Sequence, residues 1–165
     1  IWDGVTSTLQ TAGMIYVVII GAMLFASFIS VTGITDALSG AVTTFHATPL
    51  LAIIVMTLVL LLLGSFLDGV ALMLLTTPIF LPIATDLGYS AIWFGIFLVR
   101  TMEIGFVHPP LGMNIYVIQG IDKTLSLGTV FRGVIPFLVS DFLHLALLIA
   151  VPALALWLPA AIGST

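Results

Sequence analysis

The sequence predicts an all-α membrane protein. Of its 165 residues, 61% are hydrophobic and only 6% are charged, whereas soluble domains carry about 25% charged residues. The apolar residues gather in long runs, and a helix satisfies all of its own backbone groups inside a bilayer. At about 20 residues per span, the chain has room for roughly five or six membrane segments.

Charge and cysteine content narrow the possible functions. The formal net charge is −4, and the three Lys and Arg residues form no basic patch, so nucleic-acid binding has no support. Cysteine is absent, which excludes disulfides and thiolate metal sites. Because the chain begins with Ile1 and shows no signal peptide, we expect it to be a piece of a longer protein.

The first expected span runs from Leu9 to about Ser30, and its glycines offer positions for close helix packing. A polar break at 33–40 follows, and a short amphipathic piece extends to His46. A lone histidine in a connection is more often solvated than functional, so His46 receives no site role. Pro49 occupies a favoured first position of the next helix.

Residues 50–83 predict a re-entrant helical hairpin. Two apolar runs, 50–63 and 70–83, are each too short for a comfortable span and flank the polar segment 64–69. The alternative is one long helix, which would place Asp68 near the bilayer centre, and we therefore favour the hairpin. Asp68 has two open roles, a cap on the second arm and a cation ligand, and the cap matches the preference of Asp for that position.

A helix broken inside the membrane is the most informative motif. After a polar loop at 85–90, the helical segments 91–105 and 111–120 flank a stretch that contains Pro109 and Pro110. Proline has no N–H, so carbonyls of the preceding turn lose their helix donors, and free carbonyls are costly in lipid. The break indicates an ion or substrate site built from backbone. A kink satisfied by neighbouring helices or water is the alternative.

The charged residues of the last third suggest how the chain is oriented. We expect a connection from Asp122 to Gly133 and a last span from 134 to about 157. Lys123 and Arg132 mark this connection as cytoplasmic, so the hairpin would enter the membrane from the outside.

Two polar pairs lie within apolar segments. Arg100 and Glu103 are three residues apart, which favours an intrahelical ion pair over a role of Arg100 as a substrate counter-ion. Asp141 and His144 have the same spacing and predict a hydrogen-bonded pair that faces the helix bundle.

Several segments stand in an order that is known from one family. They are 63–68 (Leu-Gly-Ser-Phe-Leu-Asp), 78–82 (Pro-Ile-Phe-Leu-Pro), Gly88, 94–96, 104–105, 109–112 (Pro-Pro-Leu-Gly), 132–137 (Arg-Gly-Val-Ile-Pro-Phe) and 152–159. This order resembles the large membrane subunit, of DctM type, of the tripartite ATP-independent periplasmic (TRAP) transporters. The resemblance covers nearly the whole chain.

The resemblance implies a fold and a division of the chain. Family members are elevator-type secondary transporters of the ion-transporter superfamily, with two inverted repeats that each contain a re-entrant hairpin and a broken transmembrane helix. This chain would hold the second repeat, in the C-terminal half of the subunit. Residues 1–48 would form transmembrane and connecting helices, 49–84 the hairpin, 89–121 the broken helix, and 122–165 a cytoplasmic connection and the last span.

The resemblance also implies a sodium site between the hairpin tip and the helix break, with Gly64, Gly105, His108 and Leu111 as the expected ligands. The family usually has Thr where this chain has His108, and histidine keeps the carbonyl but replaces the hydroxyl with a titratable ring. A backbone site survives this change, and a site that needs the hydroxyl does not. For the substrate carboxylate, we expect Ser65 and Asn114, because half-helix N-termini and short polar side chains favour an anion.

These observations predict a non-enzymatic, multi-pass permease of the bacterial inner membrane. The resemblance implies uptake of a carboxylate, such as a C4-dicarboxylate or a sialic acid, with sodium, a small membrane subunit (DctQ type) and a periplasmic substrate-binding protein. One alternative is another anion permease of the same superfamily. A further alternative is a membrane-embedded hydrolase that uses Asp68 and Asp141, or the histidines, but the sequence shows no short catalytic motif. The last is a structural subunit, which leaves the Pro-Pro break without a purpose.

Overall fold

A computed structural model describes residues 2–44, 48–108 and 113–163 of the chain. Within these residues the protein is all-helical, as predicted, and forms eight α-helices. Their bounds are α1 Trp2–Thr32, α2 Ile34–Thr44, α3 Pro49–Gly64, α4 Gly69–Asp86, α5 Ala91–Val107, α6 Met113–Ile121, α7 Leu127–Ala150 and α8 Ala153–Ile162.

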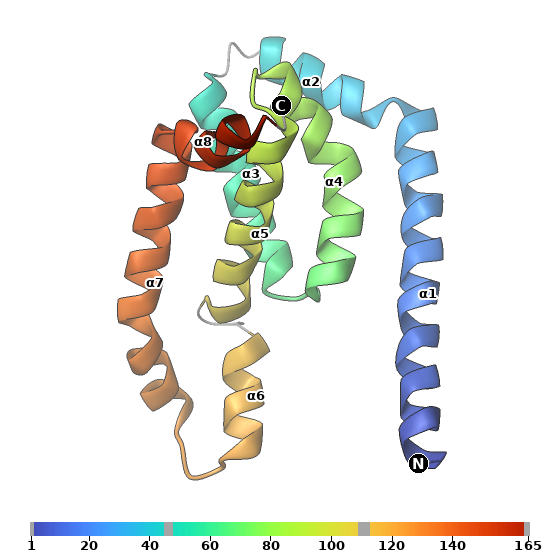
Figure 1. The fold of residues 1–165 in the computed structure, drawn as a ribbon, viewed down its shortest axis with the longest axis vertical. Helices are drawn as coiled ribbons and strands as arrows, with labels where there is room; N and C mark the ends of the chain where they lie inside the picture. The colour runs from blue at the N-terminus through green and yellow to red at the C-terminus, as the bar shows by residue number, and fades with distance from the viewer. Residues whose placement is uncertain (1, 45–47, 109–112, 164–165) are drawn as a thin grey trace.

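The helices α3 and α4 form a hairpin whose two open ends lie at the same end of the molecule (Figure 1). The tip of this hairpin is drawn at mid-height, beside the point where α5 ends. Helix α5 packs against α3, α4 and α7, while α1 packs against α4. Helix α6 continues on the far side of the break, α7 returns past both, and α8 turns across the end of the bundle (Figure 1). The tip of the hairpin therefore lies beside the end of α5, inside the helical layer.

Three of the described helices, α1, α4 and α7, are long and apolar enough to cross a membrane. Helices α3 and α8 are equally apolar but shorter, with 16 and 10 residues. These lengths differ from five or six full spans because much of the apolar sequence is folded into the paired arms of the hairpin and the two arms of the broken helix.

Short polar side chains and proline set the ends of the hairpin helices. Thr48 caps α3 by accepting the N–H of Leu51, and Pro49 follows at the first helical position. Asp68 caps α4, because its Oδ1 accepts the N–H groups of Val70 at 2.9 Å and Ala71 at 3.1 Å. The predicted capping role of Asp68 is confirmed.

The last expected span differs from the structure at both ends. Helix α7 begins at Leu127 because Ser126 accepts the N–H of Thr129, so the connection is short and Arg132 lies within the helix. The helix ends at Ala150, before Pro152, and α8 follows. The predicted single helix from 134 to 157 is therefore wrong, because a proline interrupts an apolar run that hydropathy alone reads as continuous.

The core is centred on α5, whose aromatic residues are enclosed. Trp93 and Phe97 are fully buried, and the rings of Tyr89, Trp93 and Phe97 stack in turn with centroids 4.1 and 5.1 Å apart. Trp93 Nε1 donates to the carbonyl oxygen of Leu148 at 3.0 Å. Residue 152, four positions after Leu148, is proline and has no N–H, so the indole of α5 supplies the donor that α7 lacks.

Candidate functional site

The tip of the hairpin touches the end of α5 through backbone. A Cβ atom added at Gly105 would lie 3.1 Å from Gly64 Cα and 3.3 Å from the carbonyl oxygen of Leu61. Such distances are shorter than ordinary contacts of a Cβ atom, so a side chain on Gly105 would require the hairpin backbone to shift. The two glycines that the sequence assigns to one site are thus in direct contact, and the reason for glycine is the close approach of two chains.

Oxygen atoms gather at this contact. The hydroxyl of Ser65, which is buried, donates to the carbonyl of Leu61 at 2.9 Å and lies 3.5 Å from the carbonyl oxygen of Gly105. The Gly105 carbonyl has no helix donor of its own, because residue 109 is proline. The Leu61 carbonyl already accepts the N–H and the hydroxyl of Ser65, so the Ser65 hydroxyl oxygen and the Gly105 carbonyl are the oxygens that remain for a ligand. Such hard, neutral donor atoms suit an alkali or alkaline-earth cation rather than a softer transition metal.

The other predicted site residues lie around this contact in different ways. His108 is the C-terminal cap residue of α5, and its ring contacts Phe142 of α7 edge-on, with centroids 6.2 Å apart. Asn114 is exposed in the first turn of α6. Leu111 lies outside the described residues. The structure therefore brings Gly64, Ser65 and Gly105 together and directs the His108 ring toward α7.

The sequence analysis missed the carbonyl of Leu61. Leu61 precedes Ser65 by four residues, and a serine inside a helix commonly donates back to the carbonyl four positions earlier. That spacing is the only signal in the sequence for this oxygen. The close contact of Gly69 with α5 was missed too, since a Cβ at Gly69 would lie 3.1 Å from Met102 Sδ.

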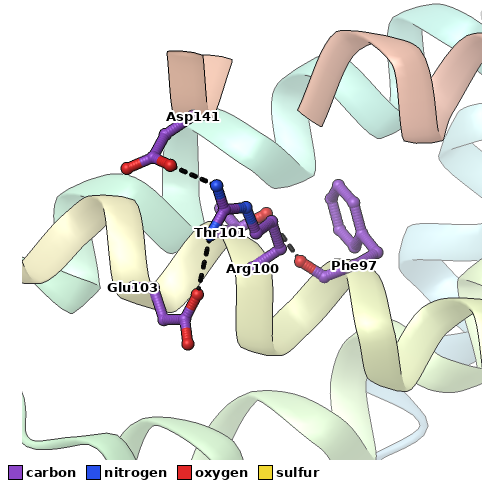
Figure 2. Close-up of polar contacts among 5 residues, drawn as sticks. All are labelled: Phe97, Arg100, Thr101, Glu103 and Asp141. Carbon is purple, nitrogen blue, oxygen red and sulfur yellow. Dashed lines mark hydrogen bonds and ion pairs between the residues drawn. The ribbon is translucent and has the colours of Figure 1, made fainter. Parts of the chain in front are cut away.

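A second polar cluster joins α5 to α7. Arg100 forms an ion pair with Glu103 at 3.0 Å, as predicted, and a further one with Asp141 (Figure 2). The predicted pair of Asp141 and His144 is wrong: Asp141 binds Arg100, and His144 is exposed one turn further along α7. A guanidinium offers a fork of charged donors to a carboxylate, which a neighbouring imidazole does not match.

This cluster is not a second anion site. Two carboxylates surround one guanidinium, so the cluster carries a net charge of −1 when all three groups are ionised. An additional anion would meet like charge there. Insertion of a charged side chain at the centre of a membrane helix costs about 2.5–3.5 kcal/mol. This cost explains why Arg100 forms ion pairs with nearby carboxylates.

Other acidic groups have structural roles. Among the described residues there is no cluster of three or more His, Cys, Asp or Glu side chains that could hold a metal ion. In the loop between α6 and α7, the side-chain and backbone hydrogen bonds of Thr124 lower the pKa of the exposed Asp122 carboxyl. The two carboxylates that a hydrolase would use have other roles in the structure. Asp68 caps α4, and Asp141 binds Arg100.

A helical hairpin whose tip contacts the end of a shorter helix, among helices that are apolar enough to cross a membrane, is an arrangement typical of membrane transport proteins. The family model of the DctM component of the tripartite ATP-independent periplasmic transporters matches residues 1–154. The chain belongs to this family, and membership places it among permeases rather than enzymes.

Individual relatives agree with this family. The chain is 35% identical over 150 residues to the C4-dicarboxylate TRAP transporter large permease protein DctM of Pseudomonas aeruginosa, covering 91% of the chain and 35% of the relative. It is 31% identical over 152 residues to the sialic acid TRAP transporter large permease protein SiaM of Vibrio cholerae, covering 92% and 35%. It is 26% identical over 159 residues to the isethionate TRAP transporter permease protein DctMQ of Oleidesulfovibrio alaskensis, covering 96% and 24%. The chain thus spans about a third of the length of the first of these relatives.

Proposed function

We propose that this chain is the second inverted repeat of an elevator-type permease that couples the uptake of a carboxylate to sodium. The observation that carries the proposal is the contact of tip and break, where the Gly105 carbonyl, the Ser65 hydroxyl and the Leu61 carbonyl converge. A broken helix inside a membrane protein commonly exposes backbone oxygens to a coupling ion. Family membership supports the same assignment.

The sodium ion would bind between the hairpin and α5. Sodium needs several oxygen ligands, and the carbonyls of Gly64, Gly105, His108 and Leu111 are the proposed backbone donors, with the Ser65 hydroxyl beside them. The C-terminal end of α5 adds the negative end of a helix dipole. The His108 ring faces Phe142, which supports a role for His108 through its carbonyl rather than its side chain.

The substrate carboxylate would bind at the N-terminal end of α6. Two half-helices begin near the break, α4 at Gly69 and α6 at Met113. The first N–H groups of α4 already bond the Asp68 carboxylate, so that end offers less to a second anion. Asn114 in the first turn of α6 is the better candidate, and Ser65 would contribute from the tip.

Substrate class and partners follow from the family. Relatives are named for C4-dicarboxylates, sialic acid and isethionate, which are all organic anions. A C4-dicarboxylate or a sialic-acid-like carboxylate is therefore the proposed cargo, delivered by a periplasmic binding protein to a complex with a small membrane subunit. Lys123 and Arg132 would place the end of the molecule that holds the α6–α7 loop in the cytoplasm, and the hairpin would open to the outside.

Uptake by the complete permease in proteoliposomes tests this function. With the small subunit and the loaded binding protein present, an inward sodium gradient should drive accumulation of the labelled carboxylate. Uptake that proceeds equally well in sodium-free buffer, with no proton gradient in its place, would contradict sodium coupling. If the sodium gradient drives uptake of an uncharged solute but not of any carboxylate, the proposed substrate class is wrong.

A further inference from the structure

One face of α5 is only partly covered within the described residues, where its main contact is the ion pair of Arg100 with Asp141 of α7. Gly95, Val99 and Glu103 stand four residues apart on one stripe of this helix, with Ile96 and Arg100 beside them. Together these five residues line a groove of about 470 Å³. The opposite side of α5 carries the buried aromatic core, so the helix separates an enclosed face from an open one.

The open face suits the close approach of another helix. No atom lies within 4 Å of the position that a Cβ on Gly95 would occupy. Ile96 and Val99 are 39% and 41% exposed and offer apolar contact on either side of the glycine. Small residues between aliphatic ones let membrane helices pack backbone against backbone, which is a main source of helix association in lipid.

Glu103 makes this face of α5 polar at one point. Its side chain is 54% exposed, and it shares the single guanidinium of Arg100 with Asp141. At about 1.5 Å per residue, Glu103 lies about 18 Å along α5 from its start, well inside a hydrocarbon layer of about 30 Å. A carboxylate at that depth that is only half covered does not face lipid chains; it faces protein or water.

We infer that this face of α5 packs against a membrane helix of the same permease that lies outside residues 1–165, and that this helix carries a Lys or Arg opposite Glu103. The relatives are about three times as long as the matched segment, which leaves room for further membrane helices in proteins of this family. A second cation would bring the Arg100 cluster to neutrality. The inference concerns the assembly of the permease and does not depend on sodium or on the substrate.

Site-specific crosslinking in the complete permease tests the identity of the partner. A photoreactive amino acid is placed at Val99, in protein that is expressed with its small subunit and in two copies with different mass labels. We expect a crosslink within one polypeptide, to a segment outside residues 1–165. Capture of the small subunit, of the other labelled copy, or of lipid alone would overturn the inference.

Charge exchange then tests the Glu103 contact. Glu103→Lys should abolish most of the Val99 crosslink and lower the thermal midpoint of the detergent-solubilised permease by several degrees, and reversal of a basic residue in the captured segment to Glu should restore both. Asp122→Lys makes the same charge change on an exposed loop carboxylate and should leave the Val99 crosslink unchanged. If Glu103→Lys does not fold, the segment crosslinked to position 99 in the protein with Glu103 intact provides the test. A captured segment without a Lys or Arg within one turn of the crosslink contradicts the proposed charge partner.

Discussion

The positions of Gly64 and Gly105 are not equivalent, although the two residues touch. A Cβ on Gly105 would lie 3.1 Å from Gly64 Cα and 3.2 Å from its carbonyl carbon, whereas a Cβ on Gly64 would lie 3.5 Å from Gly105 Cα. The first distances require the hairpin backbone to move, and the second is an ordinary van der Waals contact. The tip is thus fitted around Gly105 more tightly than around Gly64.

Gly105→Ala should therefore destabilise the permease more than Gly64→Ala does. We expect Gly105→Ala to destabilise the tip contact by about 1–3 kcal/mol, as overpacking does, and to weaken sodium binding more than it lowers expression. Gly64→Ala, which lies within α3 and gains helix propensity, is the matched control. Sodium affinity and thermal midpoint of the complete permease are the measurements. Equal effects of the two substitutions would contradict the asymmetry of the contact.

Ser65→Ala tests whether the buried hydroxyl takes part in the cation site. Loss of this oxygen should weaken sodium affinity roughly tenfold, about 1.4 kcal/mol, with little loss of folded protein. Thr76→Val is the control, because Thr76 is also buried and its hydroxyl likewise donates to the carbonyl four residues earlier, at 2.7 Å. A titration of sodium against both variants checks the prediction, and equal affinities would remove Ser65 from the site.

Trp93→Phe should destabilise the permease by about 1–3 kcal/mol, because it leaves the Leu148 carbonyl without a donor while it keeps a ring in the stack. The exposed Trp157 of α8 provides the control, and Trp157→Phe should change little. Thermal unfolding in detergent measures both. A Trp93→Phe variant as stable as the natural protein would mean that water or another group replaces the indole.

His108→Thr should keep sodium affinity close to that of the natural protein, since Thr supplies the same backbone carbonyl. His108→Pro should lose it, because a residue that precedes proline is driven away from helical geometry and Val107 is the last residue of α5. Sodium titration of both variants distinguishes the two expectations. Loss of binding in His108→Thr would show that the imidazole, and not the carbonyl, serves the site.

Local signals in the sequence predicted local structure well. A single polar segment between two short apolar runs indicated the hairpin, and Asp68 is found as the cap that its residue type favours. The spacing of Arg100 and Glu103 predicted their ion pair. Each of these features depends on neighbours along the chain, where helical periodicity fixes the distance between side chains.

Contacts between helices were harder to foresee. Asp141 was assigned to His144 on its own helix, but it binds Arg100, which is 41 residues away in sequence. The carbonyl of Leu61 left no trace in its residue type, because every residue has a carbonyl. The end of α7 before Pro152 was hidden by an apolar run that continues through α8. Packing of α5 against its neighbours decided the first two, and a single sequence does not encode that packing as a pattern. Pro152 decided the third.

Two ties between α5 and α7 have a consequence for how the permease moves. The indole of Trp93 holds the Leu148 carbonyl near one end, and Arg100 holds Asp141 two turns further along. Two fixed contacts between a pair of helices oppose both sliding and rotation of one helix against the other. Helices α5 and α7 would therefore move together as one rigid unit.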